Sequence, residues 1–162
     1  MKNEQYGPHK SSFLGMNANS AAMLAYWLHL AFIIFMFIPY FSQLSFFAPL
    51  IIFLSEKNSP FVKFHSIQCF LFNAVCQVVM WSFSISILKI SGIPFLSILT
   101  RSYDIQNIAS KNIGNIFLIC LLIFVFLIAA LIYRIVATVK ANEYTEFHMP
   151  IIGTWASKIA NS

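Results

Sequence analysis

The chain has 162 residues, of which 59% are hydrophobic and only 9% are charged. Soluble domains carry roughly 25% charged residues, so this composition excludes an ordinary soluble globular protein. The net charge is +5, but the basic residues are scattered between apolar runs and form no continuous stripe, so we expect no nucleic-acid binding.

Four apolar runs predict an all-α fold, an integral membrane helical bundle with about four transmembrane helices, the second one short or re-entrant. A helix needs about 20 apolar residues to cross the hydrocarbon core of roughly 30 Å. We expect a flexible polar N-terminal tail in residues 1–19, a membrane domain in residues 20–140 and a C-terminal interfacial tail in residues 141–162. The expected spans are residues 21–38, 42–55, 67–88 and 113–134.

The second apolar run, residues 44–54, is short enough to be either a span or a re-entrant segment. If it crosses, seven of the ten Lys and Arg residues share one side with both termini, and three lie opposite. If it is re-entrant, the division becomes five and five. Because positive residues concentrate on the cytoplasmic side, the unequal division favours four spans in a bacterial inner membrane, with both termini cytoplasmic.

The sequence patterns of soluble enzymes are missing. Phosphate-binding loops, zinc-protease motifs, nucleophile elbows and Cys-x-x-Cys pairs do not occur. The five acidic residues lie outside the expected spans, and the three cysteines lie in apolar stretches without metal-ligand spacing. We therefore expect no enzymatic activity, no cofactor and no bound metal.

The third expected span carries a polar stripe at helical spacing. A polar stripe in a membrane helix should face other helices or a wet cavity. It is interpreted either as a path or contact for a substrate, or as a set of hydrogen bonds that hold neighbouring helices together. Helix packing is the simpler interpretation. The stripe consists of His65, Cys69, Asn73, Cys76, Met80 and Ser84, with Gln68 and Gln77 beside it.

Two histidines are candidates for a functional role. His29 lies in the middle of the first expected span, where an ionisable group either serves a function or bonds a neighbouring helix as a neutral imidazole. His65 stands where the third helix begins, a few residues after Ser59 and Pro60. Ser59 is a good helix cap, and proline is favoured at the first helical position. This segment is either a capped helix start at the membrane surface or a recognition site at the cytoplasmic face.

Several segments resemble a known family. Several short stretches are similar, in the same order, to a bacterial family of small multispan membrane proteins of unknown function. They are residues 22–26, 28–30, 47–54, 59–62, 64–65, 139–144 and 150–153, together with Lys57 and Gln68. That family is related to the twenty-kilodalton protein import component of the chloroplast inner envelope. The resemblance implies a helical membrane bundle. The residues that carry it most clearly are Pro49, Ser59, Pro60, Phe61, Phe64, Lys140 and Pro150.

These observations lead to two functional hypotheses. The first is a subunit or accessory factor of a membrane complex, for which the resemblance suggests protein translocation or envelope assembly. The alternative is a homo-oligomeric channel or small-solute transporter that uses the polar stripe of the third span. In both cases the expected partners are the lipid bilayer and either other membrane proteins or further copies of the chain.

Overall fold

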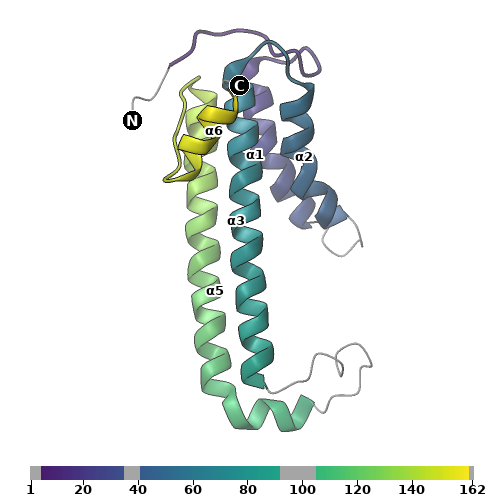
Figure 1. The fold of residues 1–162 in the computed structure, drawn as a ribbon, viewed down its shortest axis with the longest axis vertical. Helices are drawn as coiled ribbons and strands as arrows, with labels where there is room; N and C mark the ends of the chain where they lie inside the picture. The colour runs from purple at the N-terminus through teal and green to yellow at the C-terminus, as the bar shows by residue number, and fades with distance from the viewer. Residues whose placement is uncertain (1–4, 35–40, 92–104, 161–162) are drawn as a thin grey trace. The chain divides into compact units, whose positions relative to one another are not determined.

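The computed structural model describes residues 5–34, 41–91 and 105–160. Within these ranges the chain forms helices and no strand that is part of a sheet, so the predicted all-α class is confirmed (Figure 1). The helices are α1 (Ala18–Ile34), α2 (Phe41–Ser55), α3 (Pro60–Ser91), α5 (Ile105–Asn142) and α6 (Ile152–Ala160).

Two helices are long and apolar enough to cross a membrane, within Pro60–Ile90 of α3 and Ile113–Asn142 of α5. Only 11% and 6% of their most apolar windows are buried, whereas the core helix of a soluble protein would be mostly covered. α1 and α2 have 17 and 15 residues, or about 26 and 22 Å of helix. The predicted bundle is therefore supported for two spans by length and composition, and four spans are not confirmed.

The two long helices extend beyond the expected spans. α3 begins at Pro60 rather than at residue 67, and α5 runs from Ile105 to Asn142 rather than from 113 to 134. Sequence hydropathy marked only the apolar part of each helix. At the start of α3 the polar side chains of His65 and Gln68 form hydrogen bonds with other segments.

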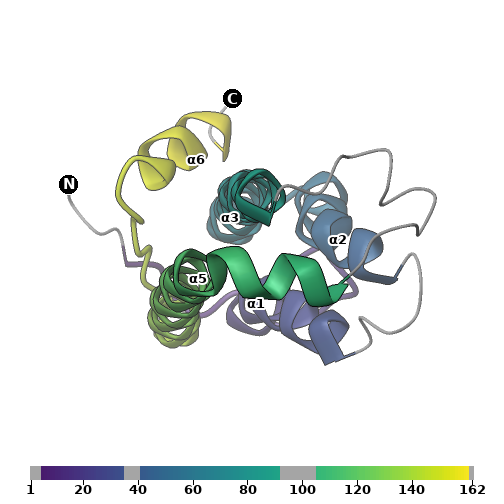
Figure 2. The same ribbon diagram turned by 90° about the horizontal axis from the view of Figure 1, so that it is seen from below.

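The chain divides into two compact units, one formed by residues 1–75 and 132–162, the other by residues 76–131. In the first unit α1 packs against α2 (Figures 1 and 2). One face of α1 is built from Ala18, Ala21, Ala22 and Ala25, all fully buried. Such small residues let helix backbones approach closely, which is how membrane helices associate without a hydrophobic driving force.

A short helix closes the first unit. α6 places Ala156 and Ala160 against Phe64 and Ile67 of α3, and these four residues form a buried apolar cluster. Gly153, in the first turn of α6, packs so closely on the preceding turn that a β-carbon there would lie 2.7 Å from the Cα of His148. No side chain fits at that distance, so the chain can turn into α6 here only with glycine.

The N-terminal segment is part of the same unit. We expected residues 1–19 to form a flexible tail. In the structure the amide of Tyr6 donates a 2.9 Å hydrogen bond to the carbonyl of Tyr144, and Gln5 pairs with Thr145. The described part of the segment before α1 therefore lies against the turn that follows α5.

The second unit presents mostly apolar surface. Within it α3 and α5 lie side by side, with the rings of Phe83 and Phe126 6.4 Å apart. Large side chains such as Trp81 and Phe117 are more than half exposed. The hydroxyls of Ser82, Ser84 and Ser86 each donate to a carbonyl one turn earlier. Polar groups satisfied within their own helix can face lipid, where water is absent.

Candidate functional site

The short connection between α2 and α3 is organised around the carboxylate of Glu56. This side chain is only 2% exposed. It accepts hydrogen bonds from two directions: from the serine pair of the N-terminal segment and from the amides that lead into α3. The donors are the Ser11 hydroxyl, the Ser12 amide and hydroxyl, and the amides of Phe13, Asn58 and Ser59. The last five donors lie 2.7–3.3 Å from the carboxylate oxygens.

These donors keep Glu56 ionised. Burial alone raises the pKa of a carboxyl group, because it disfavours the charged form. Here the hydrogen bonds from Ser11, Ser12 and Asn58 outweigh burial and lower the pKa of Glu56 from 4.5 to about 2. Through these hydrogen bonds the buried carboxylate connects the N-terminal segment to the start of α3.

The start of α3 follows the capping pattern expected from sequence. The hydroxyl of Ser59 accepts a 3.2 Å hydrogen bond from the amide of Val62, and Pro60 is the first helical residue. This satisfies one of the amides left open at a helix start. The same hydroxyl lies 2.7 Å from Nε2 of His9, so the N-terminal segment is also fastened to the cap.

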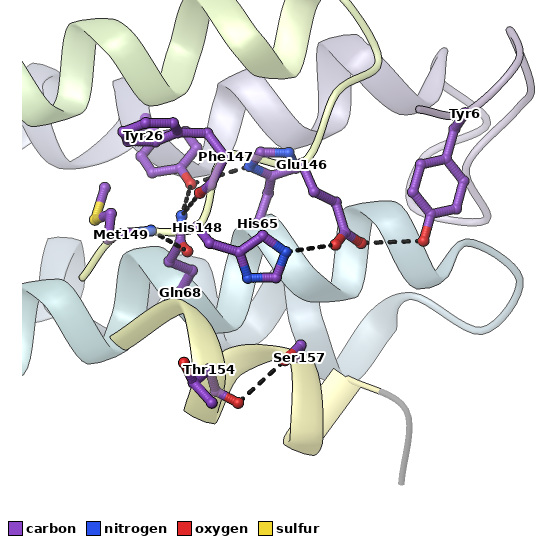
Figure 3. Close-up of polar contacts among 10 residues, drawn as sticks. All are labelled: Tyr6, Tyr26, His65, Gln68, Glu146, Phe147, His148, Met149, Thr154 and Ser157. Carbon is purple, nitrogen blue, oxygen red and sulfur yellow. Dashed lines mark hydrogen bonds and ion pairs between the residues drawn. The ribbon is translucent and has the colours of Figure 1, made fainter. Parts of the chain in front are cut away.

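The first part of α3 carries a buried polar cluster around His65 and Gln68, shown in Figure 3. Tyr26 of α1 has its hydroxyl 3.1 Å from Nδ1 of His65, and Nε2 of Gln68 donates to the same hydroxyl at 3.3 Å. The tyrosine hydroxyl therefore joins α1 to His65 and Gln68 of α3. The thiol of Cys69 donates to the carbonyl of Ala25 at 3.3 Å.

Gln68 also forms two hydrogen bonds with the segment that follows α5. Its Nε2 donates to the carbonyl of Phe147 at 2.9 Å, and its Oε1 accepts from the amide of Met149 at 3.2 Å (Figure 3). One side-chain amide thus pairs with a backbone donor and a backbone acceptor of an extended segment. That segment is held again at Glu146, which accepts from Tyr6 at 3.0 Å and lies 3.1 Å from Nε2 of His148.

A charged side chain is buried further along α3 and α5. Arg134 is 6% exposed, and its Nη2 donates to Oδ1 of Asn73 at 2.7 Å. Its guanidinium also lies 5.6 Å from the centre of the Phe72 ring. An arginine within a candidate span must face protein or water, and here it faces α3.

Binding of a metal ion by the described part of the chain would require a group of ligating side chains. No group of three or more His, Cys, Asp or Glu side chains suited to a metal ion occurs among those residues. The polar groups above serve chiefly to connect α1, α3, α5 and the segments at the chain ends.

Comparison with known proteins identifies the family. The model of the magnetosome magnetite crystal formation protein family, MamF/MmsF, matches residues 17–156. The chain belongs to this family. Neither the curated proteins nor the solved structures give a match.

Membership in the MamF/MmsF family corrects the resemblance inferred from sequence. A relation to the chloroplast import component is not supported, and the association with protein import was wrong. The structure shows why the motif misled. Ser59 and Pro60 cap a helix, and Phe61 packs its ring against those of Tyr6, His65 and Tyr144. Such features build a helix start in any process, so they carry no information about function.

The other predicted positions are placed as follows in this MamF/MmsF protein. Pro49 is buried inside α2, and the ring of Phe64 lies 4.8 Å from that of His148. The carbonyl of Lys140 accepts from the amide of Thr145, and that of Pro150 accepts from the amide of Ile152. His29 belongs to α1, but its side chain lies outside the described residues.

The predicted polar stripe of α3 divides into two parts. His65, Gln68 and Asn73 are buried and bonded to other segments, as above. Gln77 and Ser84 are exposed, so the structure does not bring them to the same cluster. The contacts of the first part are of the kind that hold helices together.

Sequence reasoning missed the partners of these residues. In the sequence Tyr26 lies in an apolar run, Arg134 is the last residue of an expected span, and Glu56 lies between two expected spans. The one available signal was that Glu56 precedes the cap Ser59 by three residues, a spacing that lets its carboxylate reach the open amides of the helix start. For Glu146 and His148 the sequence offered no signal.

Proposed function

We propose that this MamF/MmsF-family chain is a multi-pass membrane protein that acts as a non-enzymatic accessory factor in the membrane at which magnetite crystals form. The observation that carries the proposal is the family match over residues 17–156. It agrees with two long helices whose apolar faces are left uncovered. The polar side chains of α3 are engaged in joining segments, which fits a packing or scaffolding role better than a catalytic one.

The proposed topology has four spans with both chain ends in the cytoplasm. Its support is that Glu56 binds Ser11 and Ser12, and that Tyr6 binds Tyr144 and Glu146. These contacts gather the N-terminal segment, the α2–α3 connection and the turn after α5 in one unit, as expected if they share a side. That side then holds most of the Lys and Arg residues, which favours the cytoplasm.

Side-specific labelling tests this topology. In membrane vesicles, an impermeant maleimide should label Lys57→Cys and Lys158→Cys from the cytoplasmic side. It should label Tyr40→Cys, between α1 and α2, from the opposite side. If Tyr40→Cys reacts from the same side as Lys57→Cys, α1 and α2 form a re-entrant pair and the chain has two full spans.

The functional part of the proposal is tested by complementation. The chain is expressed in a magnetosome-forming bacterium that lacks its own members of the family, and crystal size is measured by electron microscopy. We expect larger crystals than in the same strain with an empty vector. If the protein accumulates in the membrane and crystal size does not change, the proposed role is refuted.

The channel alternative has less support from the site. A conducting path along α3 would need the polar stripe to line a passage. Instead Gln68, Cys69 and Asn73 direct their polar groups to α1, to the segment after α5 and to Arg134.

A further inference from the structure

The last helix carries an apolar stripe that nothing in the described part of the protein covers. Ile151, just before α6, is 75% exposed, Trp155 is 61% exposed and Ile159 is 38% exposed. Trp155 and Ile159 are four residues apart and therefore lie on one face of α6, where they form the stripe, whereas Ile151 precedes the helix with a left-handed backbone (φ 66°). Lys158 is exposed beside it. A partner for this surface must accept apolar side chains, including the ring of Trp155, and the positive charge of Lys158.

The opposite face of α6 fixes where the stripe lies. Ala156 and Ala160 pack on Phe64 and Ile67, which are four and seven residues into α3. At 1.5 Å per residue, this is about 6–10 Å along the helix from Pro60. Lys63 is half-buried in the same part of α3. The lysine and the capped helix start are features of a helix that enters a bilayer here.

We infer that α6 lies in the headgroup–acyl boundary of the bilayer, with Trp155 inserted among the lipids and Lys158 directed at the headgroups. At 9 residues, or about 14 Å, α6 is too short to cross. Amphipathic helices that lie in this layer bury their apolar face about 5–10 Å deep, and α6 packs on α3 at a similar distance from the start of α3. Tryptophan is enriched in this layer because its ring is apolar and its N–H is polar.

A lipid partner is favoured over a protein groove because the exposed face of α6 adjoins an uncovered apolar part of α3. Phe70 and Leu71 of α3 are only partly buried against the same cluster, and α3 itself is largely uncovered along its apolar window. The stripe of α6 therefore extends a surface that already suits lipid. The inference rests on the proposal that α3 spans the membrane, so its test must separate the two.

The test uses tryptophan fluorescence with lipids brominated at different depths. The full chain with Trp27→Phe and Trp81→Phe keeps Trp155 as its one tryptophan, which is excited selectively, and is placed in phosphatidylcholine–phosphatidylglycerol vesicles. We expect stronger quenching by lipids brominated near the headgroup than by lipids brominated near the chain ends. Acrylamide in the water should quench less than it quenches free tryptophan.

A matched control reports on α3. Val75 is exposed and lies about 22 Å along α3 from Pro60, near the expected middle of the bilayer. The variant Val75→Trp, with all three native tryptophans replaced by Phe, should be quenched most by the deep bromines. If this control responds to no lipid quencher, the proposed span of α3 fails.

If the control responds and Trp155 does not, only the inference about α6 is overturned. Free access of acrylamide to Trp155 would then place α6 in water, and protection from both quenchers would show that protein covers it. Deeper quenching of Trp155 than of the control would also overturn the interfacial placement.

Discussion

Replacement of Glu56 by glutamine should destabilise the protein strongly, although it changes only one buried atom and its charge. The pKa of Glu56 is 4.5 when unfolded and about 2 in the folded protein. Each pKa unit corresponds to about 1.4 kcal/mol, so the hydrogen bonds to the charged carboxylate contribute roughly 3 kcal/mol at neutral pH. Glutamine would also turn an NH₂ group toward the donors Ser11 and Phe13.

The measurement is the free energy of unfolding in mixed detergent micelles, for the wild type and Glu56→Gln. At pH 7 we expect a loss of about 3 kcal/mol. Because the folded pKa is lowered, this stabilisation is present above pH 4.5 and is lost as the pH falls towards 2. The difference in free energy of unfolding between the wild type and Glu56→Gln should therefore decrease from pH 4.5 downwards and be close to zero near pH 2.

Glu143 provides the control. Its carboxylate is half exposed and pairs with Lys140 at 2.7 Å on the surface of α5. An exposed pair contributes less than about 1 kcal/mol, so Glu143→Gln should be close to neutral at every pH. The reasoning is refuted if the two variants have equal stability at pH 7, or if the gap for Glu56→Gln does not depend on pH.

Three further substitutions test the packing of the first unit. Gly153→Ala should lower the melting temperature, at a cost of about 1–3 kcal/mol, because its new β-carbon would meet backbone at 2.7 Å; Gly114→Ala, with open space around it, should be neutral or slightly stabilising. Gln68→Leu should lower the free energy of unfolding by about 1–3 kcal/mol and make residues 143–151 more sensitive to protease, because it removes two hydrogen bonds to this segment. Gln77→Leu, at an exposed position, should change neither property. Equal digestion of the two variants would show that Gln68 does not hold this segment in place. Asn73→Leu should lower the free energy of unfolding by about 2–3 kcal/mol, since it removes the acceptor of the buried Arg134 guanidinium. An unchanged free energy of unfolding would show that this hydrogen bond does not stabilise the protein.

Local sequence rules were enough to find the start of α3. Serine followed by proline predicted the cap and the first helical residue, and both are where the rule puts them. Hydropathy located the apolar centres of α3 and α5 for the same reason, since it depends only on neighbouring residues. The all-α class follows from these local signals.

The ends of the helices and the buried contacts could not be found this way. Arg134 suggested the end of a span because a charge in lipid is costly, yet α5 continues to Asn142 since Asn73 and Phe72 surround the guanidinium. Glu56 and Ser12 are 44 residues apart, and Tyr6 and Glu146 are 140 apart. No periodic pattern in one sequence encodes a pairing over such distances.

The hydrogen bond between Tyr6 and Glu146, near the two ends of the chain, has a consequence for the order of events during biosynthesis. Ser11 and Ser12 can meet Glu56 once the first two helices have left the ribosome. Tyr6 must wait for Glu146, another 90 residues, or about 5–18 s at usual rates of translation. During that interval the N-terminal segment is held by hydrogen bonds only at the connection between α2 and α3, through Glu56 and Ser59. A nascent chain stalled before α5 is complete should therefore expose this segment to chaperones and proteases that the finished protein excludes.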